Sequence, residues 1–262
     1  MIVIDIDPML ARIGPLNISW HGLFTAVGIL VAVVLAARLA RRTGFAEDHV
    51  YGLALWAVPA GVVGARLFHV VDEFGYYAAH PLAILAIQEG GLAIYGGLAG
   101  GILGGVLYLA RHGLPLGRFA DAVAPAIILG QAIGRIGDVI DGEHHGAPAD
   151  LPWSVVYVHS NTAGEQGLAV HPSVGYEMLW DLAVFAVLLG LRDRLPRAGM
   201  LFWTYVVLYA LGRFVVGFFR TDTMLLGGLG QAQLIAVISL LVTILVLAAP
   251  SLRRGKVAGA TA

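Results

Sequence analysis

The sequence predicts an all-α integral membrane protein with seven transmembrane helices, and three observations support this fold class. The chain of 262 residues is 58% hydrophobic and only 13% charged, a composition that is not typical of a soluble domain. Its apolar residues gather in runs of about 20, the length that crosses a bilayer as a helix. Arginine and lysine fall in alternate connections between these runs.

Seven apolar runs are each long enough to span a hydrocarbon core about 30 Å thick. We place them at residues 18–40, 50–71, 91–110, 119–140, 173–191, 199–219 and 228–249. Basic residues follow the first, third, fifth and seventh runs, whereas the connections 72–90 and 141–172 contain no lysine or arginine. The positive-inside rule therefore predicts an N-terminus outside the cell and a C-terminus in the cytoplasm.

We expect one transmembrane domain over residues 1–262, with two extracytoplasmic segments. Residues 1–17 form an amphipathic arm that lacks the basic region of a cleaved signal peptide. Residues 141–172 form a small periplasmic segment between spans four and five, in which the alternation from Trp153 to His159 predicts a short strand or hairpin. The absence of cysteine excludes disulfides, thiolate metal sites and a cysteine nucleophile.

The third span contains glycine pairs at four-residue spacing: Gly96-Gly97, Gly100-Gly101 and Gly104-Gly105. This spacing leaves one side of the helix without side chains. Close packing against another helix is the first interpretation, because small residues let helix backbones approach each other in membranes. Room beside the helix for a lipid chain or a peptide is the second, and the two are compatible.

The stretch from Gln131 to Gly146 begins as apolar membrane sequence but carries charge before it ends in a polar turn. A charge inside a bilayer costs about 2.5–3.5 kcal/mol on insertion scales, and a merely structural span has no need of it. The predicted topology places four arginines in the outer halves of spans two, four and six: Arg66, Arg135, Arg213 and Arg220. Because guanidinium groups match phosphate oxygens, we interpret this cluster as a phosphate-handling site. The alternative is a set of interhelical ion pairs with Asp138 and Glu177.

Several histidines and tyrosines lie at the same predicted depth. His21 is either catalytic or part of an interfacial belt, and His144 and His145 are either solvated or act as bases. For His69 and Tyr176 we favour packing or hydrogen bonding. No metal-ligand spacing, serine-hydrolase elbow, Walker motif or dinucleotide motif occurs, so we expect no metal and no cofactor. With a net charge of −1, we also expect no nucleic-acid partner.

The stretch from Gly134 to Gly146, GRIGDVIDGEHHG, resembles the signature of the prolipoprotein diacylglyceryl transferase family of bacterial inner membranes. Shorter matches resemble the family in the same order along the chain: WHGL at 20–23, IYGG at 94–97, HPSVGYE at 171–177, Tyr209, and RFVVGFFR at 213–220. The resemblance therefore covers nearly the whole chain.

The chain departs from the family pattern at five positions in these stretches. Asp138 and Asp141 replace asparagines, His21 replaces a tyrosine and Gly217 replaces a glutamate. Tyr95 stands where many members have the histidine proposed as base. Because of these departures, two alternatives to a transferase stay open. One is a catalytically diverged paralogue, and the other is a non-enzymatic binder or transporter of anionic lipid or signal peptides. A transporter is expected to place charge along a path across the bilayer, whereas nearly all the charges here stop in the outer half.

The resemblance implies transfer of the diacylglyceryl group of the membrane lipid phosphatidylglycerol to the lipobox cysteine thiol in a preprolipoprotein signal peptide. A thioether forms and glycerol phosphate leaves. The reaction is expected in the bacterial plasma (inner) membrane, with the active site facing the outer leaflet. Arg135 and Arg213 are expected to bind the phosphate, with Arg66 and Arg220 as further phosphate partners.

The remaining candidates are bases and orienting groups. A thiol with a pKa of about 8.5 has to lose its proton before it attacks, and the base is expected to be Tyr95, His21 or a histidine at 144 or 145. Glu143 and Glu177 are expected to orient the arginines or to hydrogen-bond the headgroup. Further substrate contacts are expected from Asp138, Gly146 and Tyr209.

Overall fold

The computed structural model describes residues 1–14, 16–87, 90–144, 146–221 and 224–258, without the side chains of 16, 226 and 249–258. Within these residues, seven helices are long and apolar enough to cross a membrane. They are α1 (Trp20–Arg42), α2 (Glu47–Asp72), α4 (Ile94–Arg111), α5 (Leu116–Asp141), α6 (Ser173–Leu191), α7 (Met200–Val216, extended by η3, Gly217–Phe219) and α8 (Gln231–Ala258). The seven spans predicted from hydropathy are therefore confirmed.

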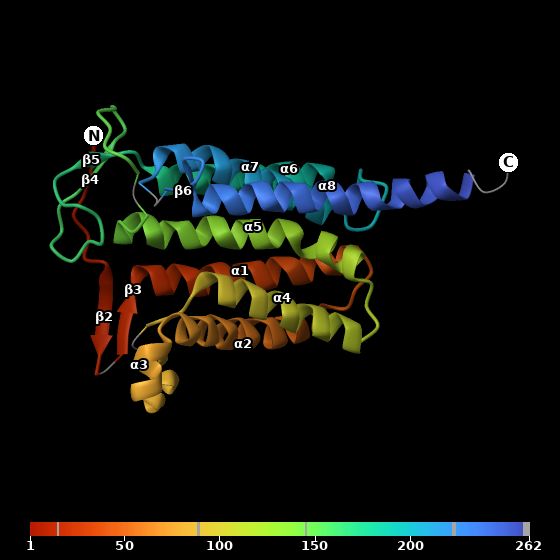
Figure 1. Cartoon of the computed structure of the whole chain (residues 1–262), viewed down its shortest axis with the longest axis horizontal. Coiled ribbons are helices and arrows are strands. Elements are labelled where there is room, and N and C mark those ends of the chain that lie inside the picture. The colour runs from red at the N-terminus through yellow and green to blue at the C-terminus, as the bar shows by residue number, and fades with distance from the viewer. Residues whose placement is uncertain (15, 88–89, 145, 222–223, 259–262) are drawn as a thin grey trace.

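Helix α5 lies in the middle of the bundle (Figure 1). On one side it packs against α1, beyond which lie α2 and α4, and on the other side it packs against α6 and α7. Helix α8 packs against α7. Two apolar cores, around the fully buried Phe119 and around Ile128 and Leu188, fill the middle and one half of the bundle. The buried charged residues Asp138, Glu177 and Arg220 belong to neither core.

The glycine pairs of α4 lie against α2 over most of their length. A Cβ atom on Gly64 or Gly96 would collide with the backbone of the other helix, and one on Gly104 would lie 2.8 Å from the Trp56 carbonyl oxygen. The two helices therefore touch backbone to backbone, which large side chains would prevent. This confirms close packing, and α2 rather than a lipid chain occupies the glycine face.

Short strands cover one end of the bundle, which we call the strand end (Figure 1). The strands are β1 (Ile2–Ile4), β2 (Met9–Ile13), β3 (Leu16–Ser19), β4 (Val155–Tyr157), β5 (Ala169–Val170), β6 (Met224–Leu226) and β7 (Leu229–Gly230). β1 pairs in parallel with β4, and β4 pairs with β5 in the opposite direction. β2–β3 and β6–β7 are antiparallel pairs that precede α1 and α8. The strand predicted between Trp153 and His159 is thus confirmed, but its pairing with the N-terminal arm was not predicted.

The β4 strand and the loop after it hold the end of α5 at which the candidate site lies. The Tyr157 hydroxyl donates to the Val139 carbonyl at 2.9 Å, and burial raises the pKa of Tyr157 to about 12, so that it remains a donor. The Thr162 hydroxyl donates to the Asp141 carbonyl at 3.0 Å. Gly142 then ends the helix with a φ of 76°, a left-handed conformation that favours glycine.

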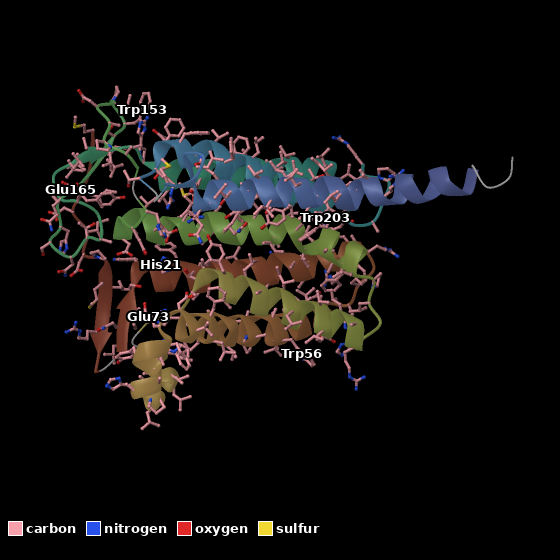
Figure 2. The ribbon with its side chains drawn as sticks, in the orientation of Figure 1. His21, Trp56, Glu73, Trp153, Glu165 and Trp203 are labelled. Atoms are coloured by element: carbon pink, nitrogen blue, oxygen red, sulfur yellow. The ribbon has the colours of Figure 1, made fainter. Side chains whose placement is uncertain are left out.

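The connection between α2 and α4 contains α3 (Phe74–Ala79) and η1 (Pro81–Leu85) and also lies at the strand end. Figure 2 shows His21 at the start of α1, with Trp153 and Glu165 at the same end of the molecule. At the other end, the Asp121 carboxylate accepts hydrogen bonds from the Gly199 and Phe202 amides at 2.6 and 2.8 Å. Asp121 therefore caps the start of α7, which gives a structural role to a charge outside the main cluster.

Candidate active site

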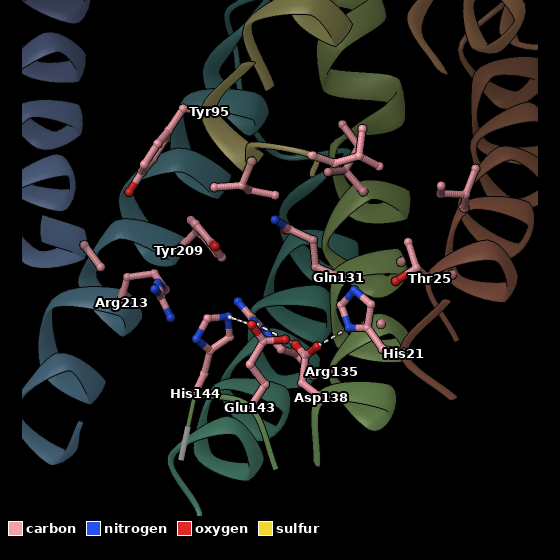
Figure 3. Close-up of a pocket in the computed structure, with 18 of the residues that line it drawn as sticks. His21, Thr25, Tyr95, Gln131, Arg135, Asp138, Glu143, His144, Tyr209 and Arg213 are labelled. Carbon is pink, nitrogen blue, oxygen red and sulfur yellow. Dashed lines mark hydrogen bonds and ion pairs between the residues drawn. The ribbon is translucent and has the colours of Figure 1, made fainter. Parts of the chain in front are cut away.

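A cavity of about 1150 Å³ lies between the two sides of the bundle near the strand end. Its wall combines polar residues with an apolar part formed by Gly28, Ile29 and Val33 of α1 and Ile127 of α5. The residues predicted from sequence that line it are His21, Tyr95, Arg135, Asp138, Glu143, His144, Tyr209, Arg213 and Arg220. All of these except Arg220 are labelled in Figure 3. The cavity therefore has one region suited to a charged group and another suited to hydrocarbon.

Three arginines from different parts of the chain meet at Glu177 of α6. Arg135 Nη2 lies 2.9 Å from one carboxylate oxygen, and Arg220 Nη1 lies 3.3 Å from the other, which also accepts from Arg213 Nη1. The Glu177 side chain is only 3% exposed, whereas those of Arg135 and Arg213 are 18% and 19% exposed. Because each guanidinium has five N–H donors, Arg135 and Arg213 can bind Glu177 and still donate to an anion in the cavity.

A second chain of contacts joins Arg135 to the start of α1. Arg135 Nη1 donates to Asp138 Oδ2 at 3.0 Å, and Asp138 Oδ1 lies 2.6 Å from His21 Nδ1. Arg135 and Asp138 stand three residues apart on α5, a spacing that brings side chains together on a helix. Asp138 is nearly buried with 8% of its side chain exposed, while His21 is 48% exposed and lines the cavity.

The turn after α5 brings Glu143 and His144 over the cavity (Figure 3). Their side chains are half exposed, and His144 Nε2 lies 3.8 Å from Glu143 Oε1. His144 has a φ of 60°, which is unusual for a residue other than glycine, and its carbonyl accepts a hydrogen bond from the Ser173 hydroxyl at 3.0 Å. His145, the other base candidate of this pair, lies outside the described residues.

Gly146 lies outside the cavity lining, although the sequence placed it among the substrate contacts. Its amide donates to the His171 carbonyl at 3.1 Å, and the next amide, of Ala147, donates to the Phe219 carbonyl at 2.8 Å. A Cβ at position 146 would lie 2.7 Å from that Phe219 oxygen. Glycine at position 146 thus lets the chain lie against His171, just before α6, and against the end of η3.

Tyr95 and Tyr209 lie on the side of the cavity that faces His21 (Figure 3). Gln131 and Thr25 also line the cavity, and sequence reasoning gave neither a role. The Gln131 side chain accepts a hydrogen bond from the Tyr205 hydroxyl at 3.0 Å. Gln131 could have been identified from the sequence, because it lies four residues before Arg135 and therefore on the same face of α5.

Arg66 is set apart from the other arginines, with which the prediction from depth along the helix had grouped it. Its guanidinium donates to the carbonyls of Ala83, Ile84, Gly90 and Gly91 at 2.6 to 2.9 Å. The residue is 6% exposed and does not line the cavity. Arg66 therefore holds the connection between α2 and α4, because α2 turns this side chain toward that connection and away from α5.

Replacing Arg66 by glutamine is expected to lower the stability of the protein without weakening anion binding. The carbonyls that it now satisfies would lose a charged donor, at a cost of about 1–3 kcal/mol. Thermal unfolding in detergent measures the first effect, and titration with inorganic phosphate measures the second. Arg135→Gln is the comparison variant, and loss of phosphate binding in both variants would return Arg66 to the anion site.

Gly217, which from the sequence is expected to depart from the family pattern, is packed against Gln233 of α8. A Cβ at position 217 would lie 2.6 Å from Cγ and 2.8 Å from Cδ of Gln233. Gln233 is 2% exposed, accepts from the Gly230 amide at 3.0 Å and donates to the Phe214 carbonyl at 3.2 Å. In this chain Gln233 therefore occupies the space next to position 217.

Gly217→Ala is expected to destabilise the protein by about 1–3 kcal/mol, because the added methyl group has to displace the hydrogen-bonded Gln233. Combined with Gln233→Ala, the same change is expected to cost clearly less than the sum of the two single changes. Thermal unfolding of the four proteins in detergent gives this coupling. Costs that simply add would show that the two positions do not compete for space.

The fold and the site define a multi-pass membrane protein with an arginine-lined cavity near one end of its helix bundle. The chain belongs to the prolipoprotein diacylglyceryl transferase family, whose model matches residues 8–249. It is 38% identical over 226 residues to a phosphatidylglycerol–prolipoprotein diacylglyceryl transferase of Clostridioides difficile, with 86% of this chain and 88% of that protein covered. Its identity to the proteins of the same name from Synechococcus elongatus and Bacillus cereus is 39% over 241 residues, covering 89% of this chain and 83% and 88% of theirs. The membership indicated by the sequence signatures is thus confirmed.

Proposed function

We propose that this protein transfers the diacylglyceryl group of phosphatidylglycerol to the lipobox cysteine of a prolipoprotein. The observation that carries the proposal is the convergence of Arg135 and Arg213, from two helices, on one cavity. Both bind the buried Glu177 and keep part of their guanidinium groups accessible from the cavity. The names of the relatives, which specify phosphatidylglycerol and prolipoprotein, support the same substrates.

The reaction needs a nucleophile that the protein does not supply, because the chain contains no cysteine. The substrate thiolate attacks the glyceryl carbon that bears the phosphoester, a sulfur–carbon bond forms and the carbon–oxygen bond breaks. The electron pair of the broken bond goes to the phosphate oxygen, so glycerol phosphate leaves with more negative charge than the diester had. Guanidinium groups placed in advance at this phosphate stabilise the developing charge, and a site that excludes water strengthens the effect.

The two parts of the cavity match the two parts of the lipid. In this proposal the phosphate lies between Arg135 and Arg213, and Arg220, which contacts Glu177 and also lines the cavity, completes the cluster. The acyl chains follow the apolar wall formed by α1 and α5 toward the middle of the bundle. Tyr209, on the same wall as Arg213, is placed to contact the headgroup.

The orientation in the membrane follows from the basic residues. Arg38, Arg41, Arg42, Arg111 and Arg118 belong to the ends of α1, α4 and α5 that lie away from the strands. Cytoplasmic segments carry an excess of arginine and lysine. The strand end, with the N-terminal arm and the loop 141–172, is therefore placed outside the cytoplasm, and the cavity serves the outer leaflet of the bacterial plasma membrane.

One assay tests the transferase function against a binder without chemistry. Purified protein is incubated with phosphatidylglycerol and a lipobox peptide, and the peptide is weighed by mass spectrometry. The expected result is a gain of one diacylglyceryl group on the cysteine peptide and none on a peptide with serine in its place. Lipid or peptide binding without a mass gain would overturn the proposal in favour of a catalytically silent paralogue.

A further inference from the structure

We infer that His21 is the group that removes the proton from the substrate thiol, and that Asp138 is its positioning residue. The inference rests on the proposed function and extends it to the proton transfer. Its basis is the contact between His21 Nδ1 and Asp138 Oδ1, which are 2.6 Å apart beside the cavity.

The hydrogen bond to Asp138 fixes the protonation pattern of the imidazole. An ionised carboxylate only accepts hydrogen bonds, so the proton of the neutral ring lies on Nδ1. Nε2 then carries the lone pair that accepts a proton. The same logic, a base oriented by a third group, activates nucleophiles in other enzymes. The second oxygen of Asp138 is held by Arg135 at 3.0 Å, which keeps the carboxylate ionised and in place.

A capping hydrogen bond and close helix packing also fix the backbone around His21. The Ser19 hydroxyl accepts a hydrogen bond from the Gly22 amide at 3.0 Å and caps the start of α1. Gly137, the neighbour of Asp138, lets α1 come close, since a Cβ there would lie 2.6 Å from the His21 Cα. The first turn of α1 is therefore fixed against the last turns of α5, and the two side chains meet as a consequence.

Two other base candidates, His144 and Tyr95, lie among the described residues and are less well arranged for this role. His144 lies 3.8 Å from Glu143, beyond hydrogen-bond distance, and both side chains are half exposed on a turn. Tyr95 is a phenol, and phenols hold their proton at neutral pH. His21 lines the same cavity as His144 and its side chain is equally exposed, so a peptide thiol can reach it. It differs from His144 in having a carboxylate, that of Asp138, within hydrogen-bond distance.

Proton transfer and group transfer then balance. His21 Nε2 accepts the thiol proton as the sulfur attacks the glyceryl carbon. The bond from that carbon to the phosphate oxygen breaks, and the oxygen takes the electron pair beside Arg135. The imidazolium passes its proton to water at the mouth of the cavity, which restores the neutral ring for the next cycle.

A pair of lipobox peptides, one with cysteine and one with selenocysteine, tests this assignment. A selenol is already ionised at neutral pH, so its transfer does not need a base. His21→Gln is expected to lower kcat for the cysteine peptide by about 10²–10⁴-fold, the usual contribution of a general base. With the selenocysteine peptide, the same variant is expected to react at a rate within about tenfold of that of the unmodified protein, because this reaction needs no base.

Asp138 and Tyr95 supply the matched variants. Asp138→Asn is expected to lower kcat for the cysteine peptide more than for the selenocysteine peptide, with little change in KM, and Asp138→Glu to restore part of the loss. Tyr95→Phe is expected to leave the ratio of the two rates unchanged. Equal slowing of both peptides by His21→Gln, or no slowing of either, would overturn the inference. Failure of the unmodified protein with both peptides would instead overturn the proposed function.

Discussion

Replacing Arg135 by glutamine is expected to slow thioether formation by about 10²–10³-fold, the usual effect of removing one donor from a developing negative charge. Arg135 connects the arginine cluster at Glu177 with the His21–Asp138 pair, because it binds Asp138 on its own helix and Glu177 on α6. Arg213 and Arg220 still neutralise Glu177 in the variant, so the helix bundle is expected to stay folded and membrane-inserted.

The matched control for this change is Arg135→Lys. Lysine keeps the positive charge but presents a single ammonium group, and it does not reproduce the planar fork that reaches two carboxylates and a phosphate. We therefore expect lysine to recover little of the lost rate. Initial rates with saturating phosphatidylglycerol and peptide, together with the amount of protein in membranes, measure both effects. A rate close to that of the unmodified protein in either variant would exclude Arg135 from the phosphate site.

Replacing Glu177 by glutamine is expected to have the largest effect on stability. Its carboxylate is almost completely buried and contacts three guanidinium groups. Breaking a buried ion pair from one side costs about 3–5 kcal/mol, because the remaining charges are left without a partner. The expected result is a clear fall in the midpoint of thermal unfolding in detergent. An added anion is expected to raise that midpoint more in the variant than in the unmodified protein, because phosphate replaces the lost carboxylate.

Glu143→Gln is the control for Glu177→Gln, since it removes a carboxylate that is half exposed near the same cavity. Surface changes of this kind are usually within about 0.5 kcal/mol of the original stability. Inorganic phosphate and glycerol phosphate serve as the two anions in the titration. If Glu177→Gln melts like the unmodified protein, or gains nothing from phosphate, the three arginines are not held together by this carboxylate.

The helices could be predicted because hydropathy is a local property. Connections that contain charged residues, glycine or proline separate the apolar runs. The helices of the structure begin and end close to these connections. The pairing of β1 with β4 could not be predicted in the same way. Two strands of three residues each, which begin more than 150 residues apart at Ile2 and Val155, carry no local sign of their partner.

The same division applies to the candidate site. Arg135 and Asp138 are three residues apart on one helix, so their contact follows from helical geometry. Arg66 has the same kind of charge at a similar depth, but the direction of its side chain depends on how α2 packs against α4. Depth alone therefore placed Arg66 with the other arginines, and packing separated it from them.

By itself, the sequence determined which segments are apolar enough to cross a membrane, which residues bring charge into them, and which family the chain resembles. The tertiary structure decided which of these charges meet: Glu177 with three arginines, and His21 with Asp138 across 117 positions of the chain. From the sequence, both residues of the second pair are expected to depart from the family pattern, and only folding shows that they touch. The physical reason is that contacts between helices depend on how the helices are rotated and how far apart they lie. Close approaches, such as that of Gly137 to the His21 backbone, set this rotation and spacing.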